Sequence, residues 1–412
     1  MRFHVLHTPL GTLLAYHLRQ ILPQKHAISL LCNPRDVVQE QITSNNVVRL
    51  ENSGVIMTVR NVDFEFFGPS RPSLSNEGPS RTSATSDTET PSAEDHNSKH
   101  IESLIVTVPP TDTQRTLDPL IHRLSPQSTI VLMQTGLGVY EKLITSLFPN
   151  PARRPHFIIA SPRHAAWLKE PNHVVHTLPG SIDFSIIPDP RGRDFEAVLR
   201  SRDVPAQGRG LRLTDIAHKG NDPKFGEYAS LRNTVAVLSS LDELNATWLS
   251  MEEGEIVFRR DLVVRAVTDA LAVALGLPNG ELLSTKPSKK LAEDVVKEIN
   301  GAFRAQWRTE ILSQYPLEEG QTRSRPMPVL PKGLRRNALM GELVRHLIAT
   351  GKCNAPMLDD VQAGVRTQVG HGLGYLYAIG RTYGFSMPTT SALLKMIRAK
   401  ESTGTHVETQ KK

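Results

Sequence analysis

The chain has 412 residues, 39% of them hydrophobic, and a formal net charge of +6. This length is enough for two or three domains with a sizeable core. The two cysteines, Cys32 and Cys353, lie far apart, which argues against a disulfide framework and a cysteine zinc site and fits a reducing compartment. No apolar run approaches the roughly 20 residues that a membrane-spanning helix needs.

The N-terminal region predicts a doubly wound α/β sheet. Residues 3–6 form a short apolar run, a turn containing Pro9 and Gly11 follows, and residues 13–18 continue as a helix before an apolar run at 27–31. This is a βαβ unit of about 30 residues. Further predicted strands lie at 55–60 and 63–67, read as a hairpin pair, and at 103–108, 129–133, 157–160 and 182–187, with a helix over 114–124.

Three segments interrupt or end the regular patterning. Residues 68–100 are almost purely Ser, Thr, Pro, Asn and charged residues, and the tail 402–412 is similar. Such composition cannot bury enough apolar surface to offset its ordering entropy, so both segments are predicted to be disordered. Residues 189–223 are rich in Arg, Gly, Pro and Asp and predict a long loop.

From about residue 252 the strand signals end and helical periodicity begins. Helices are predicted over 258–275, 289–308, 338–350, 357–383 and 389–400. The sequence therefore predicts an α/β domain over 1–251, followed by an all-helical domain over 252–401.

Four motifs in fixed order give the chain a resemblance to a known family. They are VLHTPLG at 5–11, QTGLG at 134–138, PNGEL at 278–282, and a last segment from MLDDV at 357–361 to GFSMPT at 384–389. In this order and spacing the chain resembles the ketopantoate reductases, which reduce 2-dehydropantoate to pantoate with NADPH. The resemblance implies a Rossmann-like N-terminal domain of the dinucleotide-binding type and a helical ketopantoate-reductase-type C-terminal domain.

The positions that hold the cofactor in this family are altered. Of the glycine-rich first turn only Gly11 stands, and Pro9 removes a backbone donor, so NADPH binding is expected to be weakened or lost. Arg35 lies where the family places a cation for the 2′-phosphate; the alternative is a solvated loop charge. Thr135 replaces the family's asparagine beside Gly136, a glycine that can also serve only to shape a tight turn.

The resemblance also implies changed chemistry on the helix before PNGEL. Counting back from that motif, the family's lysine position holds Asp261, and its two asparagine positions hold Arg265 and Asp269. A 2-oxo acid develops negative charge as hydride arrives, which a cation stabilises and a carboxylate repels. The family's serine and glutamate positions on the last helices hold Pro356 and Gln368.

The three charges at 261, 265 and 269 admit several interpretations. Spaced four apart with alternating sign, they can form a self-neutralising ladder along one helix face. A new catalytic role and a face that binds a partner stay open as alternatives. His371, near Gln368, is the residue that can act as an acid or base near neutral pH, and its alternative is an ordinary helix-surface histidine.

Three functions follow as hypotheses. The first is a catalytically degenerate relative with a binding or regulatory role; its basic balance fits a phosphate-bearing partner such as RNA or a ribosome in mitochondria. The second is an active NADPH-dependent 2-dehydropantoate 2-reductase of pantothenate biosynthesis, or a reductase of another 2-oxo acid. The third is a redox sensor that binds the nucleotide without turnover.

The sequence leaves compartment and assembly open. The first predicted strand begins at about Arg2, so no cleavable presequence is expected ahead of the fold. This favours the cytoplasm, while entry into the mitochondrial matrix by an uncleaved or internal signal stays open. A monomer and a homodimer are both consistent with the resemblance.

Overall fold

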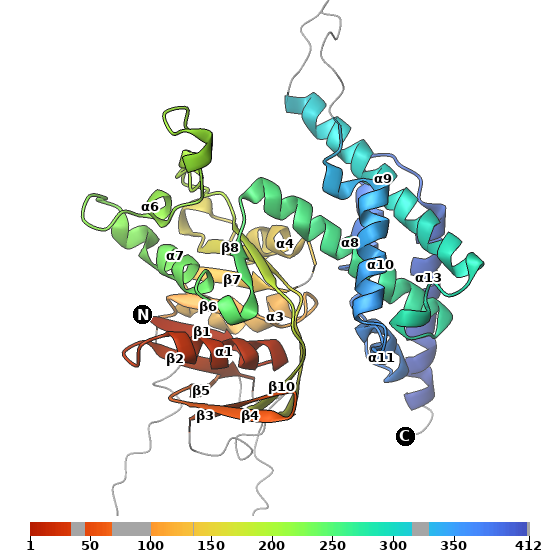
Figure 1. Cartoon of the computed structure of the whole chain (residues 1–412), viewed down its shortest axis with the longest axis horizontal. Coiled ribbons are helices and arrows are strands. Elements are labelled where there is room, and N and C mark those ends of the chain that lie inside the picture. Colours follow the sequence, from red (N-terminus) through yellow and green to blue (C-terminus); the bar gives the residue numbers. More distant parts are fainter. Residues whose placement is uncertain (34–45, 68–99, 135, 315–328, 410–412) are drawn as a thin grey trace, which may run out of the picture. The chain divides into compact units, whose positions relative to one another are not determined.

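The computed structural model describes residues 1–33, 46–67, 100–134, 136–314 and 329–409 (Figure 1). The chain divides into two compact units, Met1–Gln134 with Tyr140–Met251, and Thr135–Val139 with Glu252–Lys412. The first is α/β and the second is helical, which confirms the predicted fold class. Of the predicted insertion at 68–100, all but His100 lies outside the described residues.

The α/β unit is built on a large sheet, sheet A, which has eight strands in the described residues. Their order is β12-β11-β8-β7-β6-β1-β2-β5, and neighbours are parallel except β8 with β11. Strands β6 and β7 are buried along their whole length, as strands in a covered parallel sheet are. The strands are β1 (Arg2–Leu6), β2 (Ala27–Cys32), β5 (Asp63–Phe66), β6 (Ser103–Val106), β7 (Thr129–Met133), β8 (His156–Pro162), β11 (Ile182–Ile186) and β12 (Ala246–Trp248).

A second sheet, sheet B, was not predicted. It has the order β4-β3-β10-β9 among the described residues, with β3 (Val47–Asn52), β4 (Val55–Arg60), β9 (Ala165–Glu170) and β10 (His173–Leu178). The predicted hairpin of 55–60 with 63–67 is wrong, because β4 pairs with β3 in sheet B whereas β5 pairs with β2 in sheet A. Asn61, with a φ of 63°, interrupts the extended backbone between β4 and β5.

Six helices belong to the described part of this α/β unit, and α1 (Pro9–Ile21), α6 (Leu213–Ile216) and α7 (Phe225–Leu238) contribute to the apolar core shared with the sheets. The other three are α3 (Thr113–Leu117), α4 (Val139–Ser146) and α5 (Ala197–Arg200), with 3₁₀ turns η2 (Asp118–Arg123), η3 (Pro151–Arg153), η4 (Ala206–Gly208) and η5 (Asp242–Leu244). The helix predicted over 114–124 therefore ends at Leu117 and continues as η2, since Pro119 lacks the N–H that an α-helix interior needs. The predicted loop over 189–223 contains the short helices α5 and α6.

The helical unit has its own core, and its long first helix begins at Met251. Its helices are α8 (Met251–Leu275), α9 (Lys286–Gln314), α10 (Arg336–Ala349), α11 (Pro356–Gln362), α12 (Leu373–Thr382) and α13 (Pro388–Thr409), with η6 (Asn279–Glu281) and η7 (Lys332–Leu334). On α10, Leu339, Leu343 and Leu347 are buried, as their four-residue spacing predicts.

Two helix predictions need correction. The single helix predicted over 357–383 is two helices, because Gly364 with a φ of 69° ends α11 and a turn leads into α12. The disordered tail predicted from Ser402 is helical up to Thr409, since α13 extends through it. Extension of an existing helix adds one hydrogen bond per residue and needs no new nucleus. None of the helices in the described ranges is long and apolar enough to cross a membrane.

Candidate functional site

The first turn of the α/β unit, between β1 and α1, is held by its own side chains. Thr8 is the N-cap of α1, and its Oγ1 accepts a hydrogen bond from the Gly11 N–H at 3.0 Å. The same hydroxyl lies 2.7 Å from Oγ1 of Thr107, which donates to the Leu6 carbonyl at 3.0 Å. This is the arrangement by which Thr caps a helix.

Gly11 is required by packing. A Cβ at this position would lie 1.9 Å from the carbonyl oxygen of Leu6 and 2.9 Å from Oγ1 of Thr107. In glycine-rich first turns the last glycine permits close contact between helix and strand, and the earlier ones let the backbone approach a pyrophosphate. The glycine that this chain keeps is therefore the one that serves the fold.

The first turn offers few free backbone donors to a dinucleotide pyrophosphate. Such a group is bound by free backbone N–H groups at a helix N-terminus. Here Pro9 has no N–H and that of Gly11 is taken by Thr8, so two of the first three helical positions offer no N–H to an outside acceptor. The side chain of His7 lies close by, with Nε2 2.6 Å from the carbonyl oxygen of Pro171.

The other predicted cofactor positions are only partly visible. Arg35 and Thr135 lie outside the described residues. Gly136 and Gly138 have φ values of 133° and 85°, so the turn after β7 uses backbone conformations that favour glycine. The strands β1, β6 and β7 are parallel neighbours, so all three end at the same edge of sheet A.

The charged residues of α8 interact with other helices inside the helical unit. The carboxylate of Asp269 accepts a hydrogen bond from the backbone N–H of Met357, in the first turn of α11. The N-cap residue of α11, Ala355, has no side chain for this task. Asp269 thus satisfies a free N–H of a neighbouring helix, where a carboxylate also interacts well with the helix dipole.

The pKa of Asp269 is raised to about 7. Burial is the main cause, and the charge of Asp360 adds to it, while Arg265 and the Met357 N–H oppose it. His346, on α10, has a lowered pKa, first because it is buried and next because of Arg265, whereas Asp261 and Glu342 act in the opposite direction. The charges of Asp261 and Arg265 therefore act on α10, and those of Arg265 and Asp269 on each other.

The two remaining family positions lie at the start of α11 and in the segment before α12. Pro356 is exposed at the first position of α11, where proline is favoured because no hydrogen bond is lost. Gln368 is half-buried in the turn before α12, and its carbonyl accepts the N–H of His371 at 2.9 Å. His371 thus lies in a turn, and its prediction as a helix-surface histidine is wrong. The interactions of Asp269 with Met357 and of the α8 charges with His346 were not predicted, since they join positions more than 80 residues apart.

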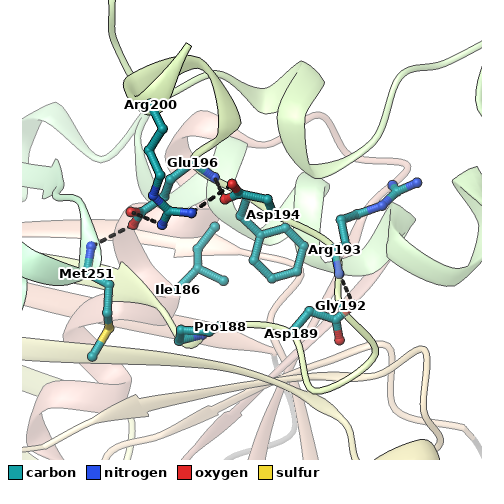
Figure 2. Close-up of a pocket in the computed structure, with 10 residues that line it drawn as sticks. Ile186, Pro188, Asp189, Gly192, Arg193, Asp194, Glu196, Arg200 and Met251 are labelled. Carbon is teal, nitrogen blue, oxygen red and sulfur yellow. Dashed lines mark hydrogen bonds and ion pairs between the residues drawn. The ribbon is translucent and has the colours of Figure 1, made fainter. Parts of the chain in front are cut away.

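A separate pocket of about 230 Å³ lies in the α/β unit, beside β11 (Figure 2). It is lined by Ile186, Pro188, Asp189, Gly192, Arg193, Asp194, Phe195, Glu196, Arg200 and Met251. Most of the lining comes from the loop predicted over 189–223, which no sequence motif had marked as a site.

The charged groups around this pocket are paired within the protein. Arg200 donates to Asp194 at 2.7 Å and lies 3.5 Å from Glu196, whose carboxylate also accepts the N–H of Met251 at 2.6 Å. Arg193 makes two bonds to Asp222, of 2.7 and 3.0 Å. These contacts fix the loop against the start of α8 and leave little for a ligand to bind. No group of three potential metal ligands occurs in the part of the chain that the structure describes.

Two family models match the sequence. Residues 10–189 match the family described as ketopantoate reductase PanE/ApbA, and residues 259–401 match its C-terminal model. A curated relative is a probable 2-dehydropantoate 2-reductase of Schizosaccharomyces pombe, 21% identical over 209 residues. That match spans 50% of this chain and 51% of the relative, so it covers about half of each.

Solved structures share the fold over nearly the whole chain. A PanE/ApbA family ketopantoate reductase from Ralstonia eutropha JMP134 has a TM-score of 0.64 at 15% identity, covering 98% of this chain and 100% of that one. D-mandelate dehydrogenase in complex with NADH and anilino(oxo)acetate has a TM-score of 0.63 at 14% identity, covering 98% and 99%. With both units matched in order by its models and its fold shared along the chain, this protein belongs to the ketopantoate reductase family.

Proposed function

We propose that this chain is a catalytically degenerate member of the ketopantoate reductase family that serves as a binding or regulatory protein. The observation that carries the proposal is the capped first turn. The Thr8 hydroxyl accepts the Gly11 N–H, and Pro9 has no N–H. The turn therefore offers a phosphate fewer backbone N–H donors than a glycine-rich nucleotide-binding turn does. We expect NADPH to bind weakly or not at all.

The charges of α8 support the same proposal. A reductase of 2-oxo acids needs a cationic proton donor beside the reacting carbonyl, and the matching position holds the carboxylate of Asp261. Arg265 and Asp269 act on each other and on neighbouring helices of the same unit. They therefore serve as a self-neutralising structural group, as the ladder interpretation predicts.

The alternative is an active NADPH-dependent reductase of 2-dehydropantoate or another 2-oxo acid. The D-mandelate dehydrogenase structure with NADH shows that this fold can hold a nicotinamide cofactor. A redox sensor that binds the nucleotide without turnover is intermediate between the two. RNA or a ribosome as partner, and mitochondria as location, stay predictions that rest on the basic charge alone.

The test compares the natural chain with two designed variants in an assay of NADPH oxidation with 2-dehydropantoate. One variant restores the family residue types on α8 (Asp261→Lys, Arg265→Asn, Asp269→Asn). The other opens the first turn (Thr8→Gly, Pro9→Ala). We expect no turnover by the natural chain, and none by the first variant alone because the nucleotide is still excluded. Turnover by the natural chain would reject the proposal and establish the reductase alternative.

A further inference from the structure

The two edges of sheet B differ in how they are protected against pairing with another strand. Within the described residues β4 pairs with β3 on one side, and its other side is an open edge. Its sequence, VIMTVR, has no proline and no charge before Arg60. Val55, Ile56 and Met57 have exposed fractions of 61%, 54% and 38%. Natural sheets avoid such edges, because an exposed apolar edge strand is a template for association.

The opposite edge, β9, carries the protection that β4 lacks. Lys169 and Glu170 lie on it and pair with β3 side chains, Lys169 with Glu51 at 3.2 Å and Glu170 with Arg49 at 3.4 Å. The pairing of β9 with β10 also shifts register twice, next to His173/Val174 and next to His176/Leu178. Charges and irregular pairing both discourage addition of a strand. Among the described residues, sheet B thus has one edge with charges and irregular pairing, β9, and one edge, β4, that lacks both before Arg60.

The apolar face of sheet B continues to this edge. Opposite residues of neighbouring strands share a face, and β3 pairs Val48 with Val59 and Leu50 with Met57. Val48 and Leu50 are fully buried and Val59 packs on the same core, whereas Met57 is exposed. The core surface therefore extends past β3 and stops uncovered at β4.

We propose that two copies of this chain associate through β4, each strand pairing antiparallel with its counterpart to give one sheet of eight strands. Two copies related by a two-fold axis present the same face, so residues opposite each other must point to the same side of the strand. The register centred on Met57 sets Met57 against Met57 of the second copy and Val55 against Val59. The exposed apolar residues of this face then cover one another.

Self-pairing in this register brings no like charges together. Arg60 falls opposite Gly54 of the second copy, and Ile56 falls opposite Thr58. The register centred on Thr58 would instead place Ile56 opposite Arg60, and the register centred on Ile56 would pair only residues 55–57 of each strand with one another. Because the Met57 register pairs Met57 with Met57 and Val55 with Val59 and keeps Arg60 away from apolar side chains, it fits a second copy of this strand. Since β4 lies outside the first turn and the helical unit, its self-pairing is independent of the proposed function.

Analytical ultracentrifugation of the full chain over a concentration series tests the proposal. We expect a reversible monomer–dimer equilibrium. Met57→Lys should raise the dimer dissociation constant at least about tenfold, because it sets two cations against each other. Trp167→Lys, a matched change of an exposed apolar residue on the β9 edge, should leave it unchanged. A natural chain that stays monomeric, or equal effects of the two variants, would overturn the proposal.

Cysteine crosslinking tests the register of the two β4 strands, because each variant changes a single β4 residue and keeps the others. In a Cys353→Ser background, Met57→Cys should oxidise to a disulfide-linked dimer, since opposite residues of antiparallel strands lie about 4.5–5.5 Å apart at Cα. Thr58→Cys should crosslink much less, because its counterpart is displaced along the strand. Equal crosslinking at both positions, or none at Met57→Cys, would contradict this interface.

Discussion

Replacing Asp269 by Asn should remove a large part of the pH dependence of the stability of the helical unit. The pKa of Asp269 is about 7 in the folded protein, against an ordinary value of 3.8. Between these values the folded chain holds a proton that the unfolded chain has released, so stability is highest at low pH and falls as pH rises through 7. Asn cannot ionise, but its amide oxygen can still accept the Met357 N–H.

The size of the effect follows from the two pKa values. Linkage gives a loss of roughly 2.5 kcal/mol between pH 5 and pH 8 from this single group. Urea unfolding followed by helical circular dichroism at both pH values measures it in the natural chain and in Asp269→Asn. Asp294→Asn, a change at a partly exposed carboxylate on α9, is the control. If the natural chain and Asp269→Asn lose the same stability from pH 5 to pH 8, the buried environment inferred for Asp269 is refuted.

Three further substitutions test the α/β unit. Gly11→Ala should destabilise it by more than about 3 kcal/mol, because the new Cβ meets the Leu6 carbonyl at 1.9 Å; a melting temperature within a few degrees of the natural chain would show that the turn adapts. Glu65→Ala should cost about 3–5 kcal/mol in urea unfolding, since it leaves the buried guanidinium of Arg123, 2.6 Å from Glu65, without its carboxylate; a cost below 1 kcal/mol would contradict this. Thr8→Ala should cost about 1 kcal/mol as the α1 cap is lost, and an unchanged stability would argue against the cap.

Local patterns predicted much of the fold. The βαβ start, the buried strands β6 and β7, and the leucine spacing on α10 each depend on nearby residues, and each appears in the structure. Sheet B was missed because β3 and β10 pair across more than 120 residues. The false hairpin has the same origin. The strands β4 and β5 are close in sequence, which favours a hairpin, but β4 pairs with β3 and β5 pairs with β2.

The candidate site divides in the same way. The sequence itself shows that the first turn lacks the earlier glycines. A Thr-Pro pair before an apolar run is a typical start of a helix. The contact of Asp269 with Met357 is tertiary, and nothing in the spacing of 261, 265 and 269 indicates that one of these charges satisfies the N-terminus of α11. The packing role of Gly11 likewise becomes evident only from the short distance between a Cβ at this position and the Leu6 carbonyl oxygen.

We propose that the first turn does not bind a dinucleotide, and isothermal titration of the purified full chain with NADPH tests this most directly. A parallel titration of the Thr8→Gly, Pro9→Ala variant serves as the comparison, because it frees the Gly11 N–H and returns one at position 9. We predict no saturable heat for the natural chain at millimolar NADPH and measurable binding for the variant. Micromolar binding of NADPH by the natural chain would contradict the claim.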